Sequence, residues 1–214
     1  KAFGVNEFAA RFPNAVCGIV SLLLIFNIGT KLFNRRFGLW WVIVYAGSIL
    51  PHFYFRSGII DPWFNLLIFV AIWFFVKLNG AGEVVPAWRK IIYSALWGVF
   101  TGLAILTKGP TALLIVGLVV AVAYLPHLLL LLKIKLKFLP SEPIFRIRFG
   151  DIAVFLLFTI LIGGSWFFIQ MLTGHSDMVM KFIEYQIRLF RIPDAGHGGP
   201  WYYHFVILLV GVFP

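Results

Sequence analysis

Asp61 is the carboxylate whose position in the sequence most strongly indicates a chemical role. It lies between two apolar runs, after the polar residues 56–58 and directly before Pro62. An aspartate followed by proline is typical of a helix start, because the carboxylate caps free backbone N–H groups. A carboxylate at the mouth of a helical hairpin also suits metal binding or the positioning of an acceptor hydroxyl. The two roles are compatible, and the sequence leaves both open.

Lys108 lies in a second short turn, between two further apolar runs. Gly109 permits an unusual backbone turn, and Pro110 is typical of the entry to the next helix. The ammonium group can extend to the membrane boundary along its own alkyl chain. It can also bind a phosphate beside the start of the following helix.

Arg188 lies in a segment, residues 181–191, whose pattern predicts an amphipathic helix on the membrane surface. A guanidinium group matches phosphate oxygens in a bidentate manner, so Arg188 and Arg191 suit an anionic ligand. The apolar positions that this helix is predicted to turn inward are Phe182, Ile183, Ile187 and Phe190.

His197 follows in a glycine-rich stretch that would let a ligand approach the backbone closely. Its imidazole is a candidate for contacting such a ligand, and the alternative is an ordinary loop histidine. Trp201, Tyr202 and Tyr203 come next. Tyr202 and Tyr203 are candidate site residues, although aromatic residues here also suit the membrane–water boundary.

The composition shows what kind of protein must position these residues. Hydrophobic residues make up 61% of the chain and charged residues 12%, and the mean hydropathy is +0.96. A soluble domain has roughly 45–50% apolar and 25% charged residues. The net charge of +10 does not indicate nucleic acid, because the basic residues lie between apolar runs, as in membrane proteins. The single cysteine, Cys17, excludes an internal disulfide.

The apolar runs predict an all-α polytopic membrane protein with about six complete transmembrane spans and part of a seventh. A crossing helix needs about 20 apolar residues, and these runs lack the alternation of barrel strands. The predicted spans cover approximately residues 8–29, 39–55, 63–76, 91–106, 110–132 and 152–172, with the seventh beginning near residue 201.

The loop charges predict the orientation. Alternate loops share a side of the membrane, and the side richer in lysine and arginine is expected to be cytoplasmic. That side carries Lys31, Arg35, Arg36, Lys77, Arg89, Lys90, Lys133, Lys135, Lys137, Arg146 and Arg148, against seven basic residues on the other side. Asp61, Lys108, Arg188 and His197 all fall on the other side. The sequence therefore predicts a site for an anionic ligand on the outer face.

Taken in order, these motifs resemble the dolichyl-phosphate-mannose protein mannosyltransferase superfamily, in particular its bacterial branch that includes the aminoarabinose transferases of lipid A. The resemblance rests on residues 6–13, the hairpin around Asp61, the turn at residues 106–110 and the segment at residues 196–203. Each motif alone is weak, but their order and spacing are fairly specific.

This resemblance implies a membrane glycosyltransferase with a GT-C-type transmembrane helix bundle. Such enzymes take a sugar from a polyprenyl-phosphate donor and pass it to a lipid, protein or other glycan on the outer face of the bacterial cytoplasmic membrane. Residues 1–214 would form part of that domain, without its first helix, its first external loop and its C-terminal part. The principal catalytic carboxylate is expected in that first loop, so the chain alone is expected to be inactive.

The resemblance also assigns roles to individual residues. Asp61 matches the second acidic position of the family, and His197 matches a histidine near the donor site. Arg188 matches an arginine in the family's helix that runs from a glutamate to an arginine. Lys108 and Arg188 are expected to bind the donor phosphate, with His197 nearby. Asp61 and His197 are candidate ligands of a divalent metal. Tyr185 replaces a histidine found in some relatives, so no role is transferred to that position.

A transporter or flippase for a lipid or an anion is the alternative class. Transporters often carry charges near the bilayer midplane and show internal repeats. The centres of the apolar runs here are nearly free of charge, and no internal repeat is evident. These observations favour the enzyme.

Overall fold

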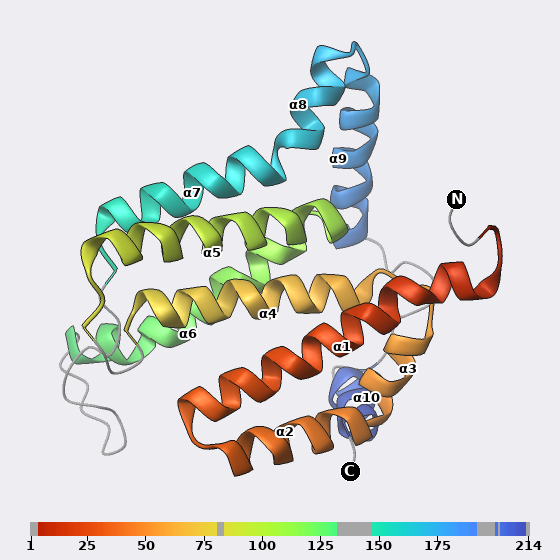
Figure 1. The fold of residues 1–214 in the computed structure, drawn as a ribbon. Helices are drawn as coiled ribbons and strands as arrows, with labels where there is room; N and C mark the ends of the chain where they lie inside the picture. The colour runs from red at the N-terminus through yellow and green to blue at the C-terminus, as the bar shows by residue number, and fades with distance from the viewer. Residues whose placement is uncertain (1–3, 81–83, 132–146, 192–199, 201, 213–214) are drawn as a thin grey trace. The chain divides into compact units, whose positions relative to one another are not determined.

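The computed structural model describes residues 4–80, 84–131, 147–191, 200 and 202–212, and within these ranges the regular secondary structure is α-helical (Figure 1). The all-α fold predicted from the sequence is therefore confirmed. The chain divides into two compact units, residues 1–66 with 182–214, and residues 67–181. The helices are α1 (Glu7–Leu32), α2 (Arg35–Gly47), α3 (Ile49–Arg56), α4 (Asp61–Leu78), α5 (Ala87–Lys108), α6 (Thr111–Leu131), α7 (Phe149–Gly163), α8 (Ser165–Leu172), α9 (Ser176–Arg191) and α10 (Tyr203–Gly211).

The apolar helices support a membrane-spanning bundle. Among the described residues, α1, α4 and α5 are each long and apolar enough to cross a membrane. Two further candidate spans are bent pairs, α2 with α3 at 68° and α7 with α8 at 48°. The helix α6, Thr111–Leu131, corresponds to the span predicted for residues 110–132, and its segment Thr111–Pro126 is apolar. The described residues thus contain three to five candidate spans, and the count of six stays a prediction.

The two bends correct the expectation of continuous helices over residues 39–55 and 152–172. The first break falls at Ser48, whose hydroxyl donates to the carbonyl of Val44 at 2.7 Å. Pro51 lies in the first turn of α3, where a missing backbone N–H is tolerated. The second break falls at the glycine pair 163–164, and paired small residues are a common site of helix kinks.

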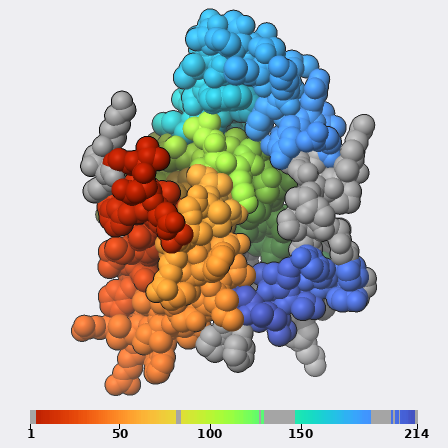
Figure 2. All heavy atoms as spheres, turned by 90° about the vertical axis from the view of Figure 1, so that its right-hand side faces the viewer, coloured from red at the N-terminus to blue at the C-terminus, as the bar shows by residue number. Residues whose placement is uncertain are grey.

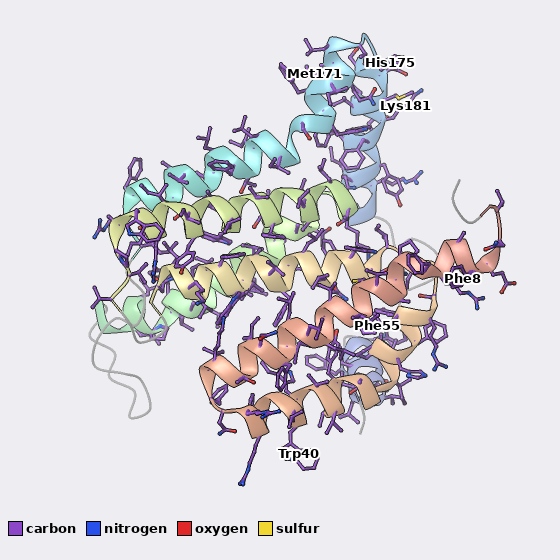
Figure 3. The ribbon with its side chains drawn as sticks, in the orientation of Figure 1. Phe8, Trp40, Phe55, Met171, His175 and Lys181 are labelled. Atoms are coloured by element: carbon purple, nitrogen blue, oxygen red, sulfur yellow. The ribbon has the colours of Figure 1, made fainter. Side chains whose placement is uncertain are left out.

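In the first unit, α1 and α2 form a close antiparallel hairpin. The side chain of Asn34 caps α2 by accepting from the backbone N–H of Phe37 at 2.9 Å. Gly38 faces α1 so closely that an added Cβ would lie 2.6 Å from the hydroxyl oxygen of Thr30. The small residues therefore allow the two backbones to approach, as in other membrane helix pairs. Trp40, on the far side of α2, points away from this interface (Figure 3).

The same unit places α3 between α1 and α10. Phe55 of α3, labelled in Figure 3, lies against Gly18 of α1, where an added Cβ would be 2.8 Å from the ring. Gly211 of α10 abuts Leu50, and the hydroxyl of Ser48 donates to the carbonyl of Val212 at 3.3 Å. The short helix α3 is thus fixed from two sides, directly before the turn that carries Asp61.

In the second unit, α5 and α7 pack in parallel through small residues. A Cβ added to Gly98 would meet the backbone of Phe155 and lie 2.9 Å from the Cβ of Phe158. One turn later, a Cβ on Gly102 would lie 2.8 Å from the Cβ of Ile162. The pairs Gly98–Phe158 and Gly102–Ile162 have the same separation along the chain, so the two helices stay in register. The glycine spacing of four residues is the small-residue motif that brings membrane helices together.

An aromatic cluster fills the centre of the second unit. The ring of Trp97 stacks on Phe155 with 3.7 Å between centroids and also contacts Phe75 of α4 at 5.2 Å. Ala71 and Leu78 of α4 complete this cluster and are fully buried.

Candidate functional site

Asn14 of α1 fixes the turn that leads into Asp61. Its side-chain amide donates two hydrogen bonds, to the carbonyl of Ser57 at 2.7 Å and to the carbonyl of Ile59 at 2.6 Å. Asn14 is only 3% exposed, so an amide that would be unfavourable in an apolar interior is satisfied here. The backbone two to four residues before Asp61 is therefore held by a helix from the beginning of the chain.

The residues of α1 that contact this turn and α3 recur at every fourth position. Ala10, Asn14 and Gly18 lie one above another on the helix, because residues four apart share a face. Asn14 binds the turn, and Gly18 leaves room for the ring of Phe55. The start of α1 and the segment around α3 and α4 accordingly lie side by side in Figure 2, in red and orange.

Asp61 is the first residue of α4 and is half-buried. The carbonyl of Ile60 already accepts from the backbone N–H groups of Trp63 and Phe64, at 3.1 and 3.2 Å. Asp61 therefore lies in the first helical turn, one position later than the cap position predicted from the sequence. A negative charge there still interacts favourably with the N-terminal end of the helix.

Lys108 lies in the turn that the sequence predicted, in the second unit. It is the last residue of α5 and is exposed. Gly109 has a φ of 71°, and its N–H donates to the carbonyl of Ile105 at 2.7 Å. The carbonyl of Pro110 then accepts from Leu113 at 3.0 Å as α6 begins. The ammonium group is thus carried at the end of one helix, directly before the start of the next.

Arg188 lies on α9, which confirms the predicted helix. Its guanidinium group lies over the ring of Tyr185 at 5.3 Å, and the arginine is exposed. Phe182 is half-buried as predicted, but Ile183 and Ile187 are 42% and 49% exposed. An apolar face that contacts the membrane is exposed on the protein itself, so the inward orientation of these residues and of Phe190 stays a prediction.

The candidate residues are divided between the two units of the chain. Lys108 belongs to the second unit and Arg188 to the first, so their convergence on one phosphate stays a prediction. His197 lies outside the described residues. Tyr203 begins α10 and is half-buried, whereas Tyr202 precedes that helix and is 51% exposed. The two tyrosines lie in the first unit with Asp61.

Among the residues that the structure describes, no group of three or more histidine, cysteine, aspartate or glutamate side chains could hold a metal ion. The metal role predicted for Asp61 and His197 stays a prediction.

The apolar helices, the close small-residue helix contacts and the bent spans together define a polytopic α-helical membrane protein. The profile of the dolichyl-phosphate-mannose-protein mannosyltransferase family matches residues 1–141, which is more than half of the 214 residues. The chain belongs to this family, as the motifs in the sequence predicted. The matched range contains Asn14, Asp61 and Lys108.

Curated relatives resemble nearly the whole chain at low identity. An undecaprenyl phosphate-alpha-4-amino-4-deoxy-L-arabinose arabinosyl transferase of Pectobacterium carotovorum is 28% identical over 99% of this chain. The protein of the same name from Edwardsiella ictaluri is also 28% identical, and one from Pseudomonas fluorescens is 26% identical, each over 99% of the chain. The chain spans only 35% of the first two relatives and 36% of the third. No solved structure matches it.

Proposed function

We propose that the protein containing this chain transfers a sugar from a polyprenyl-phosphate donor to an acceptor on the outer face of the bacterial cytoplasmic membrane. The observation that carries this proposal is the family match over residues 1–141, a range that includes the Asp61 turn and Lys108. The relatives named as undecaprenyl-phosphate aminoarabinose transferases support an undecaprenyl-phosphate donor. Lipid A is the first acceptor to test, with protein or another glycan as the further candidates.

The chemistry requires few protein groups. A sugar–phosphate ester already contains a good leaving group, so the protein must stabilise the charge that grows on the phosphate and activate an acceptor hydroxyl. In the proposed mechanism, Asp61 positions the hydroxyl and assists its deprotonation. Lys108 and Arg188 stabilise the departing polyprenyl phosphate, with His197 nearby. Charge-assisted bonds of this kind gain strength at a membrane boundary, because the local dielectric is low.

The hydrogen bonds of Asn14 support the role of Asp61. Catalysis depends on groups held in place before the substrate arrives, because misplacement of about 1 Å can lower a rate roughly a hundredfold. A turn bound by two short hydrogen bonds to a buried amide provides such a fixed position.

The full-length protein, purified and reconstituted, distinguishes this proposal from a transporter. It should move a labelled sugar from a polyprenyl phosphate onto lipid A or another added acceptor, and a nucleotide sugar should not replace that donor. A protein that only moves the labelled lipid between leaflets, without forming a glycosylated product with any of these acceptors, would contradict the proposal and favour the flippase.

A further inference from the structure

A cavity of about 430 Å³ lies in the second unit, lined by residues of α5, α6 and the start of α7. The stacked rings of Trp97 and Phe155 form one wall, and Gly117 and Val120 of α6 contribute to another. Its volume is within the range of about 300–1,000 Å³ that is typical of small-molecule pockets. The lining is almost entirely apolar, so the cavity suits a hydrocarbon chain.

The cavity runs along α5 and α6, from Leu113 in the first turn of α6 to the start of α7. Trp97 precedes Lys108 by eleven residues on α5, which corresponds to roughly 16 Å along the helix. Tyr124, Ile147 and Ile152 extend the cavity toward the opposite end of α5, where that helix begins. The backbone N–H of Ile147 donates to the hydroxyl of Tyr124 at 3.2 Å, which fixes that end.

In the described part of the chain, two arginines and a tryptophan lie level with this end of the cavity. Arg148 directly follows the lining residue Ile147 and is exposed. Because α5 and α7 are parallel and in register, Trp88 lies level with Arg148, and the guanidinium of Arg89 lies 5.1 Å from the Trp88 ring. In the sequence, the connection from residue 132 to α7 carries Lys133, Lys135, Lys137, Arg146 and Arg148 against the single acidic residue Glu142.

We propose that this cavity binds one acyl chain of an anionic glycerophospholipid from the leaflet on the lysine-rich side, with the phosphate against Arg148 and Arg89. Basic pockets between membrane helices on the cytoplasmic side are suited to anionic lipid headgroups. Exposed tryptophan beside arginine is typical of the membrane–water boundary, where such a headgroup lies. A donor whose phosphate binds near Lys108 would enter from the other end of α5. The proposed headgroup site therefore lies at the other end of α5 from Lys108.

Gly117 provides a way to fill the cavity without disturbing the helices. It lines the cavity, and a Cβ added there would meet nothing within 4 Å. Gly117→Leu should therefore occupy the space of the acyl chain. Leu118→Phe is the matched control, because Leu118 is 64% exposed and does not line the cavity. Arg148→Gln tests the contribution of the positive charge at this end of the cavity.

The measurement is native mass spectrometry of the full-length protein in detergent, titrated with dioleoyl phosphatidylglycerol or dioleoyl phosphatidylcholine. The wild type and Leu118→Phe should retain phosphatidylglycerol in preference to phosphatidylcholine. Gly117→Leu should weaken phosphatidylglycerol binding roughly tenfold, because displacing even two methylene groups has an effect of that size. Arg148→Gln should reduce the preference between the two lipids.

A second readout uses the wild-type cavity and does not depend on the folding of Gly117→Leu. Phosphatidylglycerol with brominated acyl chains should quench Trp97, so Trp97→Phe should remove more of the quenched emission than Trp40→Phe does. The proposal is overturned if Trp97 is not quenched, if folded Gly117→Leu retains phosphatidylglycerol like the control, or if the wild type shows no preference for the anionic lipid. Loss of undecaprenyl phosphate instead of phosphatidylglycerol from Gly117→Leu would also overturn it, because the cavity would then hold the isoprenoid chain.

Discussion

At the scale of single residues, the amide of Asn14 holds the turn before Asp61 through two hydrogen bonds to backbone carbonyls. The turn at Asp61 was predicted from the Asp–Pro pair, and the turn at Lys108 from the glycine and proline that follow it. Asn14 was missed, because its two partners lie 43 and 45 residues away along the chain. The one available signal was a polar residue on a helix face otherwise occupied by small residues, Ala10 and Gly18.

The two hydrogen bonds of Asn14 can be tested by replacing the side-chain amide that donates both of them. Asn14→Leu should leave the carbonyls of Ser57 and Ile59 without this partner and destabilise the full-length protein by about 1–3 kcal/mol. Asn27→Leu is the matched control, because Asn27 lies on the same helix, is exposed, and donates only to Leu23 one turn earlier. Thermal unfolding of the two variants in the same detergent gives the comparison. Equal melting temperatures would show that the amide does not hold the turn.

The residues proposed to bind phosphate should act on the donor more than on the acceptor. Arg188→Lys and Lys108→Ala should each raise the donor concentration needed for half-maximal transfer by roughly tenfold, because each loses a charge-assisted contact. Lys181→Ala is the control on α9, since Lys181 is exposed and pairs with Asp177 at 3.5 Å. The measurement is the transfer rate against donor concentration in the full-length protein. An unchanged donor dependence in both variants would place the phosphate elsewhere.

At the scale of helices, the apolar runs predicted where helices form but not where they break. Each predicted span corresponds to one helix or to a bent pair. The breaks at Ser48 and at the glycine pair 163–164 have local signals in the sequence, but such residues also occur within straight membrane helices. Whether a helix bends there depends on its neighbours. Leu50 of α3 packs against Gly211 of α10, a contact that spacing along the chain does not reveal.

The parallel packing of α5 on α7 depends on Gly98. Gly98→Ala should destabilise the full-length protein by about 1–3 kcal/mol, because the added methyl group meets the backbone of Phe155. Gly117→Ala is the control, since the same change on α6 meets nothing within 4 Å. Melting temperatures in detergent should fall for the first variant and stay equal or rise for the second. A Gly98→Ala variant as stable as the control would contradict the close approach of the two helices.

At the scale of the whole molecule, the composition predicted a membrane protein, and the charges of the loops predict its orientation in the membrane. The high apolar content required a membrane protein, and the apolar helices of the structure support that class. The asymmetry of basic residues predicts that Asp61, Lys108 and Arg188 face outward. The convergence of the donor residues stays a prediction, because it depends on how distant segments pack.

Sidedness and chemistry can be measured together with the full-length protein in sealed membrane vesicles of opposite orientation, each supplied externally with a labelled polyprenyl-phosphate sugar and an acceptor. We expect the wild type to form the glycosylated product in right-side-out vesicles and not in inverted ones. Asp61→Asn, which keeps much of the capping ability but loses the charge, should lower the rate by about a hundredfold or more. Asp177→Asn, a change at an exposed carboxylate of α9, should leave the rate near that of the wild type. Product formed only in inverted vesicles, or a near-normal rate for Asp61→Asn, would contradict an outer-face transferase that uses Asp61.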